Sequence, residues 1–317
     1  MNRTAVVLFN LGGPDCLRSV RPFLYNIFND PAILPLSPFL RSMVAAFISW
    51  MRAPNAKRMY KHLGGYSPLL HNTEQQAQAL QHILGEKFRV FVVMRYWQPR
   101  LKAVLPLIQA YDPDQIILLP LYPQFSSATT ASALVEWERT SSFFVGSCPT
   151  YAIRSHSTLQ GFVTALAESL CATLAALSPS AKARVLFSAH GLPQALVARG
   201  DPYVSEVEAT VSAVLQALHP VSLDWRLCYQ SRVGPVQWTK PYLEQEIIKA
   251  AREGLHLVIV PVAFVSEHSE TLFELDHVYR SLAEREGALS YTRLSTVGAH
   301  PLYIAGLADM VKSWRDF

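Results

Sequence analysis

Residues 264–276, FVSEHSETLFELD, hold four carboxylates and a histidine directly after an apolar run. If the segment is helical from Ser269 and the preceding turn continues the helix, Glu267, Glu270 and Glu274 lie at i, i+3 and i+7 on one face. Carboxylates that share a face repel one another, so at least one pKa rises or a cation binds. The alternative is a solvated acidic helix start that the helix dipole stabilises.

His190 is the second group that can do chemistry. It ends an apolar run and precedes the turn Gly191-Leu192-Pro193, so its imidazole is placed to accept a proton or to bind a metal. A partly buried histidine with a structural hydrogen bond is the alternative. One histidine and one carboxylate are too few for a tight structural metal site, which usually has four ligands. They suit a metal that is held briefly and passed on.

Eight short runs rich in β-branched and aromatic residues predict strands, in two sets of four. Those such as QIILLPL and LVIVPV are apolar almost throughout, which is typical of a parallel sheet covered on both faces. The predicted strands are residues 4–10, 88–94, 115–121, 142–146, 184–189, 225–229, 255–260 and 290–294. The predicted helices are residues 73–84, opened by a Thr73-x-x-Gln76 capping box, 157–177, 202–219, 241–253 and 301–314.

This alternation predicts an α/β protein with two tandem Rossmann-like, doubly wound domains that face an interdomain cleft. We expect domains at residues 1–150 and 151–317, and the terminal helix, residues 301–317, can pack back on the first domain. Ligands of such sheets bind beyond the carboxyl ends of the strands. Polar residues follow most of the predicted strands there, among them Asn10, Arg95, Tyr96, Tyr122, His190, Gln230, Ser231 and Glu267.

Composition limits the class of protein. The 317 residues are 50% hydrophobic and 16% charged, enough to bury a large core in two domains. A net charge of +4 is too small for a nucleic-acid footprint. The four cysteines have no Cys-x-x-Cys spacing, which indicates a reducing compartment. No apolar run has transmembrane length, and the run at residues 5–9 is too short for a signal peptide. We therefore predict a cytoplasmic protein.

Nucleotide chemistry lacks its motifs. Gly12-Gly13 precedes Pro14 without the third glycine of a dinucleotide-binding turn. The chain has neither a phosphate-binding G-x-x-x-x-G-K-[ST] loop nor a G-x-S-x-G nucleophile elbow. Kinase, dehydrogenase and α/β-hydrolase activities are therefore not expected, and neither is a nucleotide partner.

Residues 33–59 combine bulky apolar side chains with Arg41, Arg52, Lys57 and Arg58. A helix of this kind can lie on an anionic membrane or form the lip of a site for a large flat apolar ligand. Burial of part of the segment in the core is the alternative. The segment thus predicts peripheral contact with a membrane as one of its roles.

Nearly the whole chain resembles the ferrochelatases, the enzymes that insert ferrous iron into porphyrin in haem synthesis. The resemblance is carried by LFNLGGPDCLRSVRPFLYNIFND, RYW and LPLYPQFSSATTAS in the first half, and by LFSAHGLP, YQSRVGPVQW and PVAFVSEHSETLFELD in the second. It implies two similar Rossmann-like halves, with protoporphyrin IX and ferrous iron as substrates.

By this resemblance, His190 and Glu270 bind ferrous iron and are the catalytic pair, with His190 accepting a pyrrole proton. Glu267, His268 and Glu274 extend a polar path for protons or metal. The porphyrin-binding residues are Leu11, Arg95, Tyr96, Tyr122 and Ser231, with Tyr122 also near a metal route.

The sequence departs from the family pattern at two places. Some members hold an iron-sulfur cluster through an internal Cys and a cysteine-bearing C-terminal extension, but Ser127 stands near the internal position and no Cys follows Cys228. We therefore expect no cluster and no permanently bound cofactor. Glu267 stands where many members have Asp, which keeps the charge.

The NLGGP segment resembles the branch that uses protoporphyrin. Three alternatives stay open: a coproporphyrin ferrochelatase, a chelatase for cobalt and a more acidic tetrapyrrole, and a porphyrin or haem binder without turnover.

Overall fold

The chain is built round two parallel four-stranded sheets, one in each of two units. The computed structural model describes residues 3–146, 148–178, 180–218 and 223–314. Unit 1 comprises Met1–Tyr122, Ser126–Ser155 and Leu307–Phe317, and unit 2 comprises Pro123–Phe125 and His156–Gly306.

In unit 1 the sheet has the order β2-β1-β3-β4. Every residue of the central strand β1 is buried, because helices cover both faces of the sheet. On one face, Val7 and Phe9 pack with Leu105 of α4 and Trp137 of α5. The elements are β1 (Thr4–Asn10), α1 (Val20–Phe28), α2 (Pro38–His62), α3 (Leu69–Leu84), β2 (Phe88–Met94), α4 (Leu101–Tyr111), β3 (Gln115–Pro120), α5 (Thr130–Val145) and β4 (Thr150–Ala152).

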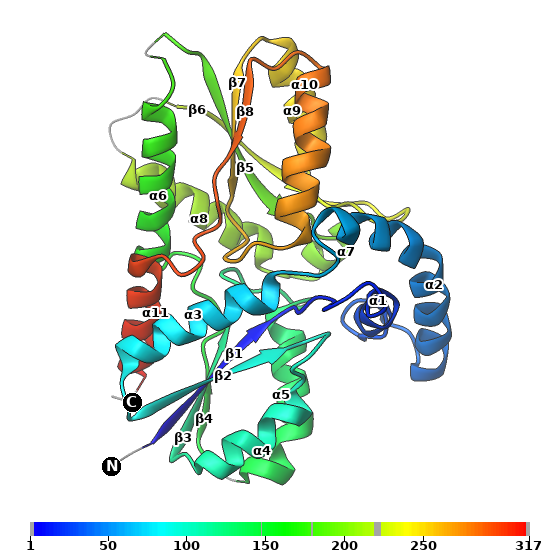
Figure 1. Ribbon diagram of the computed structural model, residues 1–317, viewed down its shortest axis with the longest axis vertical. Helices are drawn as coiled ribbons and strands as arrows, with labels where there is room; N and C mark the ends of the chain where they lie inside the picture. The colour runs from blue at the N-terminus through cyan, green and yellow to red at the C-terminus, as the bar shows by residue number, and fades with distance from the viewer. Residues whose placement is uncertain (1–2, 147, 179, 219–222, 315–317) are drawn as a thin grey trace. The chain divides into compact units, whose positions relative to one another are not determined.

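Unit 2 repeats this arrangement with the order β6-β5-β7-β8. Figure 1 shows α6 and α8 on one side of its sheet and α9 and α10 on the other. The elements are α6 (Gln160–Ala175), β5 (Ala183–His190), α7 (Gln194–Val197), α8 (Tyr203–Ala217), β6 (Asp224–Gln230), α9 (Leu243–Arg252), β7 (His256–Pro261), the π-helix η1 (Glu270–Tyr279), α10 (Arg280–Arg285) and β8 (Ser290–Arg293). A last helix, α11 (Pro301–Ser313), begins in unit 2 and ends in unit 1.

The two sheets have the same strand order, so the prediction of two similar doubly wound halves is confirmed. In this topology the chain reverses its winding direction between β1 and β3, and again between β5 and β7. Ligands of open α/β sheets bind at such switch points, beyond the carboxyl ends of the strands. His190 is the last residue of β5, and the segment that leads to η1 follows β7.

The predicted strand at residues 142–146 is wrong. These residues form the last turn and end of α5, and the fourth strand of unit 1 is β4. The run SSFFVG favours a strand locally, but Ala133, Trp137 and Ser141 lie four residues apart and are buried on one face of the helix. Packing of that face against the sheet overrides the local preference.

The predicted capping box at Thr73 is also wrong. Helix α3 begins at Leu69, so Thr73 lies within it and is fully buried. Its hydroxyl donates to the carbonyl of Leu69 at 2.7 Å and accepts a hydrogen bond from Asn10 Nδ2 at 3.0 Å. Thr73 therefore ties α3 to the end of β1. The predicted helix 202–219 is α8, and residue 219 lies outside the described residues.

Helix α11 is held in both of the units to which its residues belong. Within unit 2, a Cβ on Gly161 of α6 would lie 2.0 Å from the carbonyl oxygen of Leu302, so glycine permits this close approach. Within unit 1, Lys312 Nζ donates to the carbonyl of Ile83 in α3 at 3.3 Å. Residues 315–317 of the predicted terminal helix lie outside the described residues.

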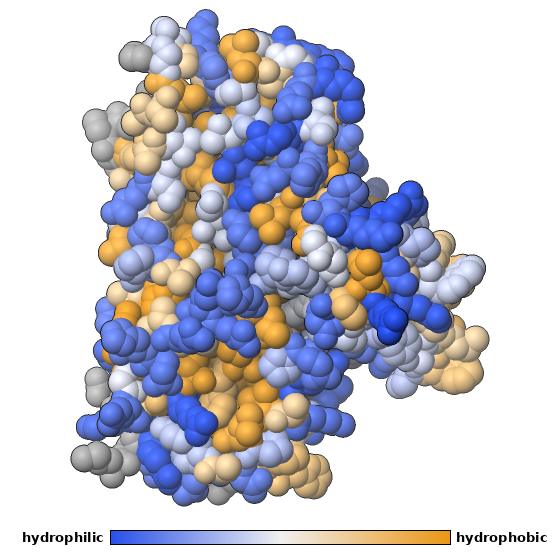
Figure 2. Space-filling model, viewed as in Figure 1, coloured by the Kyte–Doolittle hydropathy of each residue, from blue (hydrophilic) through white to orange (hydrophobic). Residues whose placement is uncertain are grey.

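The predicted lip, residues 33–59, is mostly helix α2. One of its faces leaves large apolar side chains in solvent, including Phe39 (78% exposed), Phe47 (60%) and Trp50 (61%). Figure 2 shows hydrophobic residues among hydrophilic ones on the surface that α2 forms. Within the described part of the chain, no helix combines the length and the apolar character needed to cross a membrane.

Candidate functional site

His190 and Glu270 face each other in unit 2. The imidazole Nε2 lies 3.5 Å from Glu270 Oε1, and Nδ1 lies 2.6 Å from the carbonyl oxygen of Gly191. Because a carbonyl can only accept, Nδ1 carries a hydrogen and Nε2 is the nitrogen that faces the carboxylate. The His190 side chain is 37% exposed and that of Glu270 is 29% exposed. The pair can therefore be reached from solvent.

The pair is charged at neutral pH. Burial alone would lower the pKa of His190, but the Glu270 carboxylate outweighs it and raises the pKa to about 9. Burial would likewise raise the pKa of Glu270, yet the imidazolium lowers it to about 2. His190 thus holds a proton at rest, and it can accept one from a substrate only after it has released its own. The role implied by the resemblance, accepting a pyrrole proton, therefore requires a form of His190 that is not its resting state.

Glu274 lies four residues after Glu270 in η1. Its carboxylate is held by four hydrogen-bond donors. Its carboxylate accepts hydrogen bonds from the Ser231 backbone N–H at 2.9 Å, the Ser231 hydroxyl at 2.5 Å, Gln230 Nε2 at 3.3 Å and the Tyr279 hydroxyl at 3.2 Å. Ser231 adopts a left-handed backbone, with φ of 64°, which a non-glycine residue seldom does. Burial, followed by the charge of Glu270, raises the pKa of Glu274. One carboxylate of the segment thus has the raised pKa that the sequence predicted, but burial contributes more to the rise than the neighbouring carboxylate does.

Glu267 does not share that face, contrary to the predicted i, i+3, i+7 arrangement. The helix begins only at Glu270, and Glu267 lies in the preceding loop. Its Oε1 accepts hydrogen bonds from Arg293 Nη1 at 2.7 Å and from the Thr296 backbone N–H at 2.8 Å. The three glutamates therefore have three different sets of partners, and Glu270 acts on Glu274 by charge.

His268 supports the start of η1. Its Nδ1 accepts the Glu270 backbone N–H at 3.0 Å, and its ring packs edge-on against Phe264 with centroids 4.8 Å apart. Burial lowers the pKa of His268, in keeping with an unprotonated Nδ1. This nitrogen is occupied by the backbone, so only Nε2 remains to serve a proton or metal path.

In unit 1, the predicted residues Leu11, Arg95 and Tyr96 meet at the ends of β1 and β2. The Tyr96 backbone N–H donates to the carbonyl of Leu11 at 2.9 Å, and the Arg95 N–H donates to that of Asn10 at 2.8 Å. The guanidinium of Arg95 lies 5.0 Å from the centre of the Tyr96 ring. Tyr122 follows β3, and burial raises the pKa of its phenol, with the charges of Arg95 and Asp30 also acting on it.

Three residues that sequence reasoning missed surround Arg95. Asp30 follows α1, whereas Ser132 and Glu136 lie one turn apart on α5. Asp30 accepts hydrogen bonds from Arg95 Nη2 and from the Tyr96 hydroxyl, each at 2.7 Å. Asp30 stands 65 residues before Arg95, and no local periodicity could have joined them. The only available signal was a carboxylate at the end of the family-like segment FLYNIFND.

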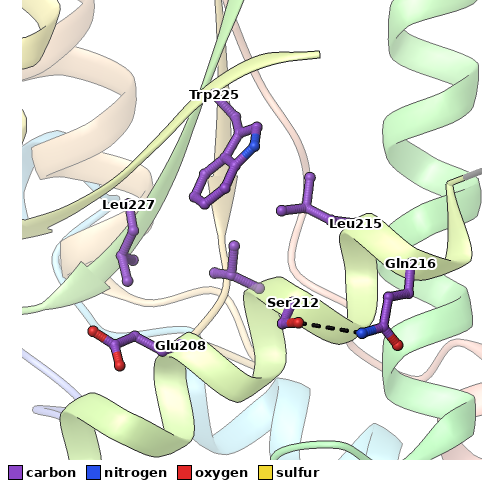
Figure 3. A pocket seen from close by; sticks show the side chains of 7 residues that line it. Glu208, Ser212, Leu215, Gln216, Trp225 and Leu227 are labelled. Carbon is purple, nitrogen blue, oxygen red and sulfur yellow. Dashed lines mark hydrogen bonds between the residues drawn. The ribbon is translucent and has the colours of Figure 1, made fainter. Parts of the chain in front are cut away.

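A shallow groove of about 490 Å³ lies elsewhere in unit 2, between α8 and β6. Figure 3 shows Trp225 and Leu227 of β6 facing Glu208, Ser212 and Leu215 of α8, with Gln216 donating to Ser212. None of the residues that line it belongs to the predicted set. The groove is therefore separate from the His190–Glu270 pair in composition and in the elements that form it.

The donor set around His190 is sparse. Among the described residues, no group of three or more histidine, cysteine, aspartate or glutamate side chains is arranged to hold a metal ion. Two ligands leave most of the coordination sphere of a metal to water or to a second molecule. The pair thus suits a metal in transit better than a stored one.

Comparison with known proteins identifies relatives over almost the full length. The family model described as Ferrochelatase matches residues 3–314. The chain is 45% identical over 315 residues to "Ferrochelatase" of Caulobacter vibrioides (strain NA1000 / CB15N), covering 98% of this chain and 90% of that one. It is 42% identical over 312 residues to "Ferrochelatase" of Wolbachia sp. subsp. Drosophila simulans (strain wRi), covering 97% and 98%. The solved structure "SirB from Bacillus subtilis with Fe3+" has a similar fold, with a TM-score of 0.57 at 14% identity over 98% of this chain and 95% of that one.

Proposed function

We propose that this chain, which belongs to the ferrochelatase family, inserts ferrous iron into protoporphyrin IX to form protohaem and two protons. The observation that carries the proposal is the His190–Glu270 pair, a proton donor and acceptor set at 3.5 Å that remains open to solvent. Ferrous iron is a substrate in this reaction. No nucleotide is consumed, in keeping with the missing phosphate-binding motifs.

The reaction needs groups for the metal and groups for its protons. Iron must exchange its waters for the four pyrrole nitrogens, and two pyrrole protons must leave. We assign Nε2 of His190 and the carboxylate of Glu270 to the incoming metal, because borderline nitrogen and hard oxygen ligands exchange readily on iron. When iron takes Nε2, the imidazolium proton departs. As iron moves on to the porphyrin, the freed imidazole can accept a pyrrole proton.

Glu274 is proposed to take protons onward from the pair. Its raised pKa brings it closer to neutral pH than an ordinary glutamate, which suits a group that alternately gains and loses a proton. Glu267 and His268 are proposed to act mainly by holding the start of η1, since each is engaged with a backbone N–H. The residues proposed to contact the porphyrin are those that the resemblance implies, Leu11, Arg95, Tyr96 and Tyr122 in unit 1 and Ser231 in unit 2.

We further propose that the protein holds no iron-sulfur cluster. Ser127 stands near the position of the family's internal cluster ligand. Purified, anaerobically prepared protein is expected to lack the visible absorption of a cluster and to contain no acid-labile sulfide. Stoichiometric sulfide would refute this part of the proposal.

An anaerobic insertion assay tests the activity. Purified protein is mixed with protoporphyrin IX and ferrous iron, and loss of the metal-free porphyrin spectrum is followed against coproporphyrin in parallel. Wild-type protein is expected to form haem from protoporphyrin. His190→Ala and Glu270→Gln should each lower kcat by about 100-fold or more, whereas His256→Ala, on β7 of the same unit, should not. Wild-type rates in both site variants would refute the assignment.

The finer localisation we propose is peripheral, on an anionic membrane surface within the cytoplasm. Between Asp30 and Glu74 the chain has no acidic residue, and α2 carries Arg41, Arg52, Lys57, Arg58 and Lys61. Exposed apolar side chains with flanking cations bind anionic interfaces through both burial and charge. Apart from its two propionates the protoporphyrin ring is apolar, so a membrane interface is where it would concentrate.

Sedimentation with vesicles tests the membrane contact. Protein should sediment with vesicles rich in phosphatidylglycerol at low salt, and the double variant Phe47→Ser/Trp50→Ser should not. Phe143→Ser is the matched control, because Phe143 is 89% exposed on α5 of the same unit and lies outside the predicted lip. The membrane contact would be refuted if all three proteins sedimented equally with the vesicles, or if none of them sedimented.

A further inference from the structure

The carboxylate of Asp30 is the centre of a buried polar cluster in unit 1. Asp30 is 3% exposed. Its Oδ2 accepts hydrogen bonds from Arg95 Nη2 at 2.7 Å, the Tyr96 hydroxyl at 2.7 Å and the Ser132 hydroxyl at 2.5 Å. Its Oδ1 accepts the Ala32 backbone N–H at 2.8 Å. Both polar ends of the Arg95–Tyr96 pair are therefore directed at Asp30.

Arg95 is engaged through all three of its guanidinium nitrogens. In addition to the bond from Nη2 to Asp30, its Nε donates to the Ser132 hydroxyl at 2.9 Å and its Nη1 lies 3.2 Å from Glu136 Oε2. Arg100 Nη2 pairs with the other oxygen of Glu136 at 3.0 Å. The cluster thus contains two arginines and two carboxylates, and its net charge is zero.

We infer that Asp30 and Glu136 determine substrate specificity, by neutralising Arg95 so that this site gives a porphyrin with four carboxylates no electrostatic advantage over one with two. The inference rests on the proposed function, and it assigns these two residues a role in choosing among porphyrins. Asp30 acts through Arg95 and Tyr96, so it is a positioning residue.

A free arginine at this position would attract every carboxylate of a porphyrin. An unpaired guanidinium binds carboxylates in charge-assisted, bidentate geometry, and its field attracts every further anionic group. Protoporphyrin IX has two propionates, whereas coproporphyrin has four. A cluster of zero net charge gives the tetracarboxylate no advantage for its extra charge. Tyr96 is 2% exposed and the Arg95 side chain is 13% exposed, so the pair presents little polar surface of its own to a ligand.

Removing one carboxylate tests the inference. Glu136→Gln keeps the size of the side chain and leaves one positive charge uncompensated at Arg95 and Arg100. The ratio of kcat/KM for coproporphyrin to kcat/KM for protoporphyrin should rise about fivefold at low salt, since one cation now acts on two additional carboxylates through solvent. High salt should reduce the gain, which a purely structural effect would not show.

Two further variants separate charge from folding. Asp30→Asn should change the ratio in the same direction, but loss of a deeply buried charge can prevent folding, so Glu136→Gln is the primary variant. Ser132→Ala removes two hydrogen bonds, to Asp30 and from Arg95, without changing the charge, and its ratio should stay within about twofold of the wild-type ratio. Asp112→Asn is the surface control, since Asp112 pairs with Arg3 and is 82% exposed in the same unit.

The outcomes separate this inference from the proposed function. A folded Glu136→Gln protein whose ratio is unchanged, or changes equally at low and high salt, would overturn the inference while leaving the activity standing. If the wild-type protein metallates neither porphyrin, the proposed function fails. Porphyrin binding without iron, measured by quenching of porphyrin fluorescence, then tests the specificity inference. Glu136→Gln should shift the relative affinity toward coproporphyrin at low salt, and an unchanged ratio of Kd values would overturn the inference.

Discussion

At neutral pH His190 is protonated and Glu270 is ionised. The proton between them is located on His190 Nε2. The Glu270 carboxylate raises the pKa of the imidazole to about 9 against the effect of burial, while the Gly191 carbonyl occupies Nδ1. A metal that binds at Nε2 must therefore displace a proton. If iron binds at His190 as proposed, this proton makes the binding step depend on pH.

Binding of ferrous iron to the wild-type protein should release about one proton at pH 7. The affinity should rise with pH up to about 9, where His190 loses its proton without the metal, and should become independent of this group above that value. Anaerobic titration calorimetry in two buffers of different ionisation enthalpy measures the released proton. His190→Ala is the control, because it has no such proton to release. Equal proton release by both proteins would contradict the prediction.

Helix η1 has π geometry because its neighbours stabilise the wider turn. The Tyr279 hydroxyl reaches Glu274, five residues earlier, which matches the i to i+5 repeat of a π-helix. Two consecutive carbonyls accept from side chains, Leu275 from the Tyr291 hydroxyl at 2.8 Å and Asp276 from Arg280 Nε at 3.2 Å. Strand β8 thus braces the helix that carries Glu270 and Glu274.

Arg293 of β8 binds both the loop before η1, at Glu267, and η1 itself, at Asp276. Its guanidinium contacts Asp276 through two hydrogen bonds and Glu267 through a third, and its side chain is 8% exposed. Arg293→Met should lower the free energy of unfolding by about 3 kcal/mol, because it leaves two carboxylates without their cation. Urea unfolding measures this loss.

The control for Arg293 is Arg252→Met in the same unit. Arg252 pairs with Glu286 but is 69% exposed, so its loss should cost less than about 1 kcal/mol. Equal losses in the two variants would show that Arg293 is an ordinary surface cation. A larger loss of insertion activity in Arg293→Met than in Arg252→Met is also expected, because η1 positions Glu270.

At the scale of the whole molecule, the two units repeat one strand order but use it differently. In unit 2 the switch point presents the charged His190–Glu270 pair, whereas in unit 1 it lies beside a cluster whose charges cancel. We therefore propose that unit 2 takes the metal and its protons, and that unit 1 contacts the apolar part of the porphyrin. Helix α11 has residues in both units.

Stability should depend on pH through His156, which is 4% exposed and meets the Tyr303 hydroxyl of α11 at 3.2 Å. Burial lowers its pKa from 6.5 to about 3. Between these values the unfolded chain binds a proton that the folded protein does not, so the free energy of unfolding falls as the pH drops below 6.5. At pH 5 the loss due to His156 should be about 2 kcal/mol.

Urea unfolding of wild type and His156→Gln between pH 7.5 and pH 5 measures this contribution. The variant should be less stable at neutral pH, because it places a different polar group in the core, but its stability should fall less on acidification. Carboxylates affect both proteins alike, so the difference between the two pH profiles isolates His156. Parallel profiles would contradict the prediction.

Sequence alone was sufficient for features that are encoded locally. The runs QIILLPL and LVIVPV, which form β3 and β7, are apolar almost throughout, and such runs are typical of strands buried between two layers of helices. His190 stands at the end of β5, and Glu270 follows β7. The chain could therefore be assigned to a doubly wound fold of two halves, and to the ferrochelatase family, before any coordinates were known.

Tertiary structure decided the features that depend on partners distant in the sequence. The run at residues 142–146 favours a strand by itself, but the buried face of α5 makes it helical. Glu267 is separated from Glu270 and Glu274 because Arg293 binds it. Asp30 meets Arg95 only because the loop after α1 folds over the end of β2. Local periodicity specifies which face of an element is buried, whereas the charge state and the role of a side chain depend on the partner it meets there.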